Sequence, residues 1–461
     1  MNAPSSPAVS LKRDLGLWSA AALVVGTVIG SGIFIVPNVM ARNVGAPGMV
    51  FVVWVAGGLM SLSGALTYAE LSAAMPGAGG EYVYLREAYG PLWSFIYGWT
   101  QMWVAKSGSI ATLATAFFLY LANFHPELKQ PIGNIPIPLG PSGVPLEINL
   151  GQILAMVLIL ALGGVNYFGV KIGGRVQVLV TLCKVGLIFA VIVIGLGTGH
   201  GDAANFATNV ISTASGPVAA FFAALVAALW AYDGWNNVAM VASEIREPQR
   251  NLPRALIGGS LAVMAIYLLA NAAYFYVLPA TEVAASDLVA ADMMRRIFGQ
   301  TGANLVSVAA MISIFAALNG SILTGSRVPY AMALDGYFFK SIARVDPTYH
   351  TPGVSILALS AWAAILVLSG RYDQLFTYVI FASWILYGMT TASVLVLRRK
   401  RPDMPRPYRT FGYPVIPIVF VMSALGLVIS TLFNSPRESL LGLALVLVGL
   451  PFYYYWAKRR M

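Results

Sequence analysis

The sequence predicts an all-α membrane protein with twelve transmembrane helices, in which two inverted halves of five helices are followed by two additional helices. Three observations lead to this fold class. The chain of 461 residues is 58% hydrophobic and only 10% charged, a balance outside the range of soluble globular domains. Its apolar residues gather in runs long enough to cross a bilayer. Two of these runs, the first and the sixth, are interrupted near their middle.

The apolar runs are separated by charged or Pro/Gly-rich segments. We expect residues 1–461 to form one polytopic membrane domain, with a first repeat at 16–197, a second at 216–397 and two further helices at 413–456. The connections 76–89 and 279–301 are expected to carry short surface helices. The expected spans are 16–42, 46–74, 92–123, 150–168, 173–197, 216–243, 253–279, 302–325, 353–370, 374–397, 413–433 and 438–456.

The first span contains a glycine-rich stretch at 24–37. Gly26, Gly30 and Gly32 make a weak helix interior, so the span is expected to break there, near the bilayer midplane. Broken backbone at that depth is tolerated only where it is buried in protein or lines a cavity. The alternative is that Gly26 and Gly30 form a small-residue packing face between intact helices.

A break in this span offers two complementary charges. The second half-helix would point the N–H groups of Ser31, Gly32 and Ile33 into the cavity, where a carboxylate can bind. The first half would present the carbonyls near Val28 to a cation. Together the two ends suit an α-amino acid.

The sixth span has its own interruption at 229–237, Leu-Trp-Ala-Tyr-Asp-Gly-Trp-Asn-Asn. An Asp, a Gly and two Asn at mid-membrane are costly in an intact helix. Spans 1 and 6 open the two halves, and five spans per half invert the second half. Interrupted segments at corresponding positions of inverted halves indicate the binding site of a secondary transporter.

Several motifs resemble a known family. The stretch 26–34, Gly-Thr-Val-Ile-Gly-Ser-Gly-Ile-Phe, resembles the span-1 signature of the amino acid–polyamine–organocation superfamily. The resemblance extends over about residues 12 to 400 and implies a leucine-transporter-like fold and transport of L-amino acids. Further stretches that resemble its L-type amino acid transporter branch are 64–71, 76–82 with 89–91, 229–236, 244–253, and 319–321 followed by Ser326 and Arg327.

The resemblance also implies roles for individual residues. The backbone N–H groups that hold the substrate carboxylate match those of Ser31, Gly32 and Ile33. The carbonyls that hold the α-ammonium match those of Val28, Trp230 and Asp233. Trp230 also matches the gating aromatic, with core packing as the alternative, and Asn236 matches a polar position beside the pocket.

Lys184 lies about ten residues into the fifth span, or roughly 15 Å deep, too far for easy snorkelling. We expect it to tie the fifth span to the broken first span; helix packing and proton carriage are the alternatives. By resemblance its ammonium takes the place of a sodium ion in sodium-coupled relatives, which implies sodium-independent exchange.

Other polar residues have two interpretations each. Asp233 either recognises a cationic substrate or caps the half-helix that follows it. Lys106 either contacts substrate or does not, and it is followed by Ser107 where the family commonly has Pro. Asn236, Asn319 and Ser321 either contact substrate or bond to one another between helices. Glu70, Glu244 and Arg327 either form an inner gate of ion pairs or are solvated helix-end charges.

The net charge of +10 is explained by the orientation of the chain in the membrane. With a cytoplasmic N-terminus, most Lys and Arg fall in cytoplasmic connections and at the cytoplasmic C-terminus, so no nucleic-acid partner is implied. Cys183 is the sole cysteine and lies in an apolar run, and the three histidines fall in predicted loops. No metal site or cofactor is therefore expected.

The expected function is secondary active transport of L-amino acids across the cell membrane by alternating access. The preferred form is a sodium-independent exchanger of small or medium neutral amino acids; the alternative is a proton-coupled amino acid or polyamine permease. An ion channel is a remote alternative, since no repeated filter sequence is present. An enzyme is not expected, because paired carboxylates, metal ligands and an activated nucleophile are lacking. Eukaryotic members of this branch pair with a heavy subunit through an external cysteine, which this chain lacks.

Overall fold

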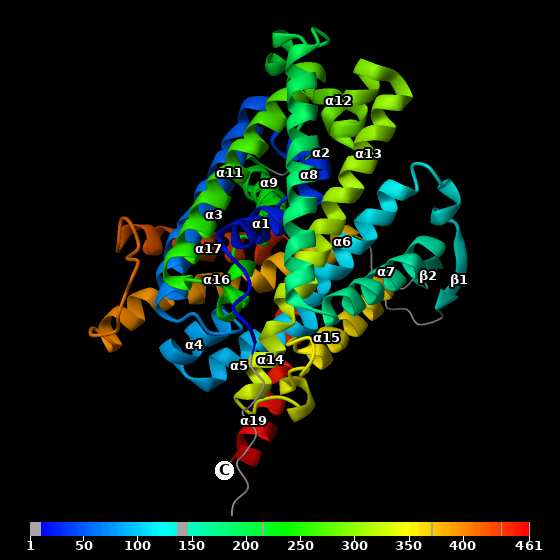
Figure 1. The fold of residues 1–461 in the computed structure, drawn as a ribbon. Coiled ribbons are helices and arrows are strands. Elements are labelled where there is room, and N and C mark those ends of the chain that lie inside the picture. Colours follow the sequence, from blue (N-terminus) through cyan, green and yellow to red (C-terminus); the bar gives the residue numbers. More distant parts are fainter. Residues whose placement is uncertain (1–10, 136–145, 214–215, 370–371, 435, 461) are drawn as a thin grey trace, which may run out of the picture.

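The computed structural model describes residues 11–135, 146–213, 216–369, 372–434 and 436–460 and is predominantly helical there (Figure 1). Within these ranges, nine helical segments are long and apolar enough to cross a membrane. Two shorter apolar helices, α9 (Pro217–Tyr232) and α15 (Gly353–Leu366), accompany them. The chain is thus an α-helical multi-pass protein.

The first half of the chain forms eight α-helices, a π-helical segment and a small hairpin. The antiparallel strands β1 (Pro131–Ile135) and β2 (Leu146–Asn149) lie between α6 and α7. The helices are α1 (Leu17–Val28), α2 (Gly32–Val44), α3 (Pro47–Ala74), α4 (Glu81–Tyr89), α5 (Pro91–Thr100), the π segment η1 (Gln101–Ala105), α6 (Lys106–Leu121), α7 (Leu150–Tyr167) and α8 (Val170–Gly197).

The second half is again helical. After α9 the elements are α10 (Asn237–Met240), the 3-10 turn η4 (Ala242–Glu244), α11 (Pro248–Val277), α12 (Ala280–Ala285), α13 (Val289–Gly325), α14 (Arg327–Leu334), α15, η6 (Val367–Ser369), α16 (Tyr372–Lys400), α17 (Val415–Asn434), α18 (Pro436–Leu447) and α19 (Gly449–Arg460).

Local sequence explains several helix ends. Helix α7 begins with a capping box, in which the Asn149 side chain accepts from the Gln152 N–H and Gln152 accepts from the Asn149 N–H. Helix α2 ends at Gly45, whose φ of 77° is the left-handed conformation that glycine adopts without strain. Helix α3 begins with Pro47, whose missing N–H is harmless in the first turn.

Of the two expected surface helices, the first differs from the prediction and the second forms. Helix α4 forms in the connection after α3 but is mostly enclosed: Glu81, Tyr82 and Tyr84 are wholly buried, because α4 packs against α5 and α16. The connection before the eighth span forms α12 and the first turns of α13, which bends at Phe298 and Gly299. Gly299 has a φ of 64°, so the bend falls where glycine permits it.

The broken first and sixth spans lie inside the bundle. Helix α1 contacts α8, α11 and α13, whereas α9 contacts α2, α3 and α16. Helix α17, by contrast, is mostly exposed and forms part of the periphery. Interrupted backbone is therefore enclosed by protein, as its polar groups require in a membrane.

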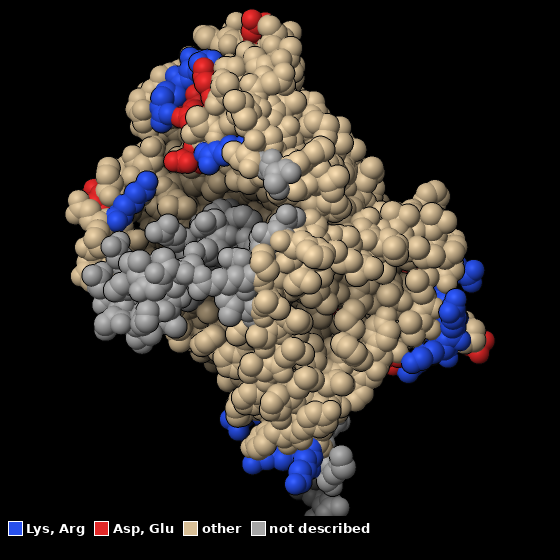
Figure 2. Space-filling view, turned by 180° about the vertical axis from the view of Figure 1, so that it is seen from behind, with Lys and Arg blue, Asp and Glu red and all other residues tan. Residues whose placement is uncertain are grey.

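Charged residues avoid the middle of the molecule. Figure 2 shows Lys, Arg, Asp and Glu gathered toward the edges of this face, with a broad uncharged surface between them. Elsewhere on the molecule, α8 exposes the apolar side chains of Leu179, Leu182 and Phe189. Such a belt fits the hydrocarbon region of a bilayer.

Candidate functional site: two broken helices around a central pocket

The first span is broken at 29–31, between α1 and α2. Ile29 has a ψ of 90° and leaves the helical conformation, and Ser31 is the N-cap of α2. The N–H groups of the first turn of α2 have no intrahelical acceptor, so this end favours an anion. A Cβ added at Gly32 would lie 2.6 Å from the Cα of Ala231; only glycine lets the two broken spans approach so closely.

The sixth span is broken at 233–236, between α9 and α10. Gly234 has a φ of 105°, which disfavours any side chain, and its carbonyl accepts a hydrogen bond of 2.9 Å from the Thr27 hydroxyl. A Cβ at Gly234 would lie 3.1 Å from the carbonyl oxygen of Thr27. The two breaks are therefore in direct contact.

Three side chains from other helices, those of Lys184, Ser313 and Tyr267, bond to the broken backbone. Lys184 of α8 is wholly buried, and its ammonium donates to the carbonyls of Gly26 at 2.6 Å and Ile29 at 2.5 Å. Ser313 of α13 donates to the same Ile29 carbonyl at 3.0 Å. These bonds satisfy carbonyls that the end of α1 leaves without helical partners.

Tyr267 of α11 joins the two breaks. Its hydroxyl oxygen lies 3.0 Å from the carbonyl oxygen of Val28 and 2.8 Å from that of Ala231. A phenol has one proton and donates to one of the two at a time. The Val28 carbonyl, expected to face the substrate ammonium, thus shares its acceptor capacity with Tyr267.

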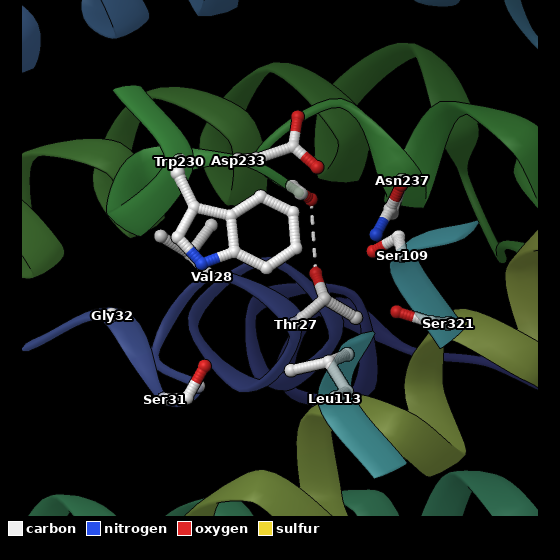
Figure 3. Close-up of a pocket in the computed structure, with 12 residues that line it drawn as sticks. Thr27, Val28, Ser31, Gly32, Ser109, Leu113, Trp230, Asp233, Asn237 and Ser321 are labelled. Carbon is white, nitrogen blue, oxygen red and sulfur yellow. Dashed lines mark hydrogen bonds between the residues drawn. The ribbon is translucent and has the colours of Figure 1, made fainter. Parts of the chain in front are cut away.

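A pocket lies between the two breaks, with an empty volume of ≈ 320 Å³ that includes its opening to solvent. Figure 3 shows the Trp230 indole extending from α9 over the first break, between Asp233 and Ser31. The lining residues are Thr27, Val28, Gly30, Ser31, Gly32, Ser109, Leu113, Trp230, Asp233, Gly234, Asn237 and Ser321.

The pocket has polar groups of opposite character. The N-terminus of α2 at Ser31 and Gly32 carries partial positive charge. Asp233 contributes a carboxylate, which accepts a hydrogen bond of 2.8 Å from the Tyr387 hydroxyl. The N-cap of α10 is Asn236, so Asp233 does not occupy the N-cap position that one interpretation gave it.

Of the predicted substrate residues, five line the pocket, and the others lie nearby. The five are Val28, Ser31, Gly32, Trp230 and Asp233. Ile33 and Asn236 are buried outside the lining, and Asn236 donates to the Glu81 carboxylate. Lys106 reaches the pocket only through Asn237, whose Oδ1 accepts from its ammonium at 2.6 Å.

The predicted interhelical polar residues separate. Asn319 lies outside the lining and contacts Asn166 and Gln177, at 2.9 Å and 3.3 Å. Ser321, two residues further along α13 and so on a different face of that helix, lines the pocket. Asn319 therefore has interhelical partners other than Ser321, whereas Ser321 lies at the pocket, where its contact with substrate stays a prediction.

The predicted inner-gate charges form two separate groups. Arg327 and Glu244 make a bidentate ion pair, with bonds of 2.8 Å and 3.1 Å and side chains 1% and 0% exposed. Glu70 instead pairs with Arg398 and Arg406. Neither pair consists of solvated helix-end charges.

The N-terminal segment lies beside the Arg327–Glu244 pair. Leu15 pairs with the end of the sixth span through its N–H to Glu244 and its carbonyl to the N–H of Arg246, at 3.0 Å and 2.8 Å. The N–H of Gly79, just before α4, donates to the Met240 carbonyl at 2.9 Å. This side of the pocket is therefore sealed by backbone bonds as well as by charge.

Several functional positions were not predicted. Thr27, Ser109, Leu113 and Asn237 line the pocket without having been singled out, and Gly30 and Gly234 were expected only to break their helices. Asn237 was indistinguishable from its neighbour Asn236 by sequence, and Glu81 was assigned to a surface helix. In the described part of the chain, no group of three His, Cys, Asp or Glu side chains could hold a metal ion.

The chain is similar in sequence to known proteins over almost its whole length. A family model described as amino acid permease matches residues 15–449. The serine/threonine exchanger SteT of Bacillus subtilis (strain 168) is 34% identical over 453 residues, 98% of each chain. The human b(0,+)-type amino acid transporter 1 is 33% identical over 448 residues, 96% of this chain and 88% of the relative. The human cystine/glutamate transporter is 30% identical over 460 residues, 99% and 88% of the two chains.

Proposed function

Since this chain belongs to the amino acid permease family, we propose that it exchanges small or medium neutral L-amino acids across the cell membrane by alternating access. The chain is a transporter and not an enzyme. The exchange mode is favoured by similarity to an exchanger over almost its whole length.

The contact between the two breaks carries this proposal. The N-terminus of α2 at Ser31 and Gly32 offers N–H groups to a carboxylate. The carbonyls at the ends of α1 and α9, near Val28 and Trp230, offer acceptors to an ammonium. These groups meet in one pocket, and they bind the parts that all α-amino acids share.

Sodium independence is supported by Lys184. Its ammonium already donates to two carbonyls at the break, where a cation would otherwise be needed to neutralise their partial charge. A fixed side-chain cation removes the need for a dissolved one.

The twelve-span, leucine-transporter-like inverted repeat is supported by the symmetry of helix contacts. Helix α1 contacts α8 as α9 contacts α16, and α6 contacts α7 as α13 contacts α15. The pair α6 and α16 likewise corresponds to α13 and α8. Each pair turns into its counterpart when span n is exchanged for span n + 5, as two equivalent halves at 16–197 and 216–397 require.

Gating is assigned to two places. Trp230 covers the pocket as an aromatic gate. On the other side, the Arg327–Glu244 pair and the N-terminal segment must separate before substrate leaves.

Since most Lys and Arg lie on this second side, both termini are proposed to be cytoplasmic. With no cysteine besides Cys183, transport needs no disulfide-linked heavy subunit.

A proton-coupled amino acid or polyamine permease is the second candidate, and one observation favours it. Glu81 is wholly buried beside the sixth-span break, with Asn236 donating to one carboxylate oxygen. A buried carboxyl that meets water on opening can take up and release a proton.

Uptake into proteoliposomes decides between the candidates. Purified protein would be reconstituted in sodium-free buffer at equal pH, and labelled neutral amino acids added with or without unlabelled amino acid inside. Uptake that requires internal substrate supports the exchanger. Uptake that ignores internal substrate but follows an imposed proton gradient supports the permease, and no uptake of any amino acid contradicts both.

A further inference from the structure

Two segments that are far apart in the sequence meet at Trp456 of α19. The indole is 8% exposed, and its ring centroid lies 5.5 Å from that of Phe338 and 5.4 Å from that of Phe339. It also lies 6.0 Å from the ring of Phe95 on α5. The last helix of the chain is thereby held against the connection that follows α14.

Both segments carry exposed basic side chains next to this aromatic contact. Lys340 begins the 3-10 turn η5 (Lys340–Ala343), and Arg344 follows that turn. Lys458 and Arg459 lie in the last turn of α19. All four side chains are exposed, and we call them the basic patch. Figure 2 shows Lys and Arg at the lower end of the molecule, the end at which Figure 1 places α19.

No described acidic side chain forms an ion pair with the basic patch. The acids nearest to it in sequence have other partners. Asp335 pairs with Arg86 at 2.6 Å, and Asp346 accepts from the Tyr167 hydroxyl at 3.0 Å and from two backbone N–H groups. The basic patch therefore attracts anions.

The order of side chains along the last two helices places the basic patch at a bilayer surface. Helix α18 exposes apolar side chains, among them Leu443 and Leu447. Helix α19 then exposes Tyr454 and Tyr455, which are 65% and 48% exposed, and its basic residues follow. Apolar, then tyrosine, then basic side chains mark a helix that passes from the hydrocarbon into the headgroup region. Phospholipid phosphates lie at that level.

We propose that the basic patch binds the headgroup of an anionic phospholipid, which bridges α19 and the connection that follows α14. The Arg459 guanidinium stacks 4.3 Å from the centre of the Tyr455 ring, which leaves its N–H edge available to phosphate oxygens. Helix α14 begins at Arg327 of the buried ion pair, on the side proposed to be cytoplasmic. The cytoplasmic surface of a membrane is negatively charged, so its lipids complement the patch.

The melting temperature of the purified protein in detergent micelles tests this proposal without a transport assay. A ligand that binds only the folded state raises its stability by mass action. Phosphatidylglycerol titrated into the micelles should raise the melting temperature, whereas phosphatidylcholine, which has no net charge, and inorganic phosphate should not. An equal rise with phosphatidylcholine would show that headgroup charge is not recognised, and an equal rise with inorganic phosphate would show that soluble anions suffice. Either result, or no rise with phosphatidylglycerol, would overturn the proposal.

Paired substitutions test whether both segments contribute. Each basic residue near an anionic surface is worth roughly fivefold in affinity. Lys340→Gln with Arg344→Gln should therefore raise the phosphatidylglycerol concentration of half-maximal effect roughly 25-fold, and Lys458→Gln with Arg459→Gln should do the same. A shift in only one of the two pairs would contradict a site that bridges the segments.

Two further variants separate this site from a general effect of charge. Arg399→Gln with Arg409→Gln removes the same charge from exposed residues at the end of α16 and just beyond it, and it should leave the half-maximal concentration unchanged. Trp456→Leu keeps all four charges but removes the aromatic contact, so it should raise that concentration. An equal shift in the control pair would show that only net charge matters, and an unchanged value in Trp456→Leu would show that the contact does not build the patch; each would overturn the inference.

Discussion

The ammonium of Lys184 lies 2.5 Å from the carbonyl oxygen of Ile29, the first residue beyond α1. This bond and its companion to Gly26 connect a long peripheral helix to the backbone that lines the pocket. A charge-assisted bond of this kind stabilises more than a neutral one. The geometry of the break therefore depends on α8, which itself contributes nothing to the pocket lining.

Removing the Lys184 ammonium should abolish most transport. In Lys184→Met the carbonyls of Gly26 and Ile29 lose a charged donor, at a cost of about 3 kcal/mol, which corresponds to roughly a hundredfold lower exchange rate. Exchange into proteoliposomes measures the loss. Lys129→Met, at an exposed position beyond α6, should retain full exchange, and a Lys184→Met protein that exchanges like the wild type would refute the role given to this lysine.

Trimming the Trp230 indole should weaken substrate binding. The ring is 6% exposed and lies over the first break; removing it uncovers apolar contact area worth about 2 kcal/mol, or roughly a thirtyfold higher half-saturation concentration. Trp230→Phe should change it far less. The control is Trp18→Ala, since Trp18 is 80% exposed. If Trp230→Ala has the half-saturation concentration of the wild type, Trp230 does not act as a gate.

The sequence predicts backbone features of this protein better than side-chain directions. Gly30 and Gly32 in one span, and Asp233 with Gly234 in another, indicate breaks because they disfavour helix wherever they stand. The helices begin and end near the predicted limits because hydrocarbon thickness restricts their length. Such properties belong to short stretches and need no knowledge of neighbours.

The choice between Asn236 and Asn237 shows what the sequence leaves undetermined. Adjacent residues at a helix break point in different directions, and the direction depends on where α4 and α6 bring Glu81 and Lys106. The π segment before Lys106 changes the register of that helix. Glu81 was placed on the surface because a short charged and aromatic helix looks amphipathic, although α5 and α16 enclose it.

Breaking the buried Arg327–Glu244 pair should loosen the side of the protein where the N-terminal segment pairs with the end of the sixth span. In Glu244→Gln the Arg327 charge remains 1% exposed without its partner, a loss of about 3 kcal/mol. Ala239→Cys in a Cys183→Ser background reports opening, because Ala239 is wholly buried where Gly80 approaches it. An impermeant thiol reagent should label this cysteine faster in the Glu244→Gln variant.

Two comparisons make this test specific. The double variant Glu244→Leu with Arg327→Met should label more slowly than Glu244→Gln, because neither charge is left unpaired. Glu247→Gln, whose exposed pair with Arg250 spans 3.7 Å, should label like the parent. Equal labelling in all four proteins would show that the pair does not hold this side closed.

The pH dependence of the protein's stability should show that the Glu81 carboxyl titrates. Burial raises the pKa of its carboxyl above the ordinary value of 4.5, and the hydrogen bond from Asn236 and the charge of Lys106 oppose that rise. Glu81 is wholly buried, and its carboxylate joins α4 to the sixth span by accepting from Asn236, so unfolding or opening exposes it to water. The other titratable groups that face it are Lys106, Tyr68, Tyr84, Tyr97 and Tyr387.

A carboxyl with a raised pKa in the folded state stabilises that state fully below its unfolded pKa, and this contribution is lost as pH rises through the folded pKa. As pH rises from 4.5, this group should lower the free energy of unfolding by at most about 1.4 kcal/mol per pH unit. The melting temperature of the detergent-solubilised protein should therefore fall over the same range. Glu81→Gln should remove that part of the slope, because an amide does not titrate. Glu87→Gln, on the same helix but partly exposed, should keep it, and a Glu81→Gln protein with the wild-type slope would show that another group titrates.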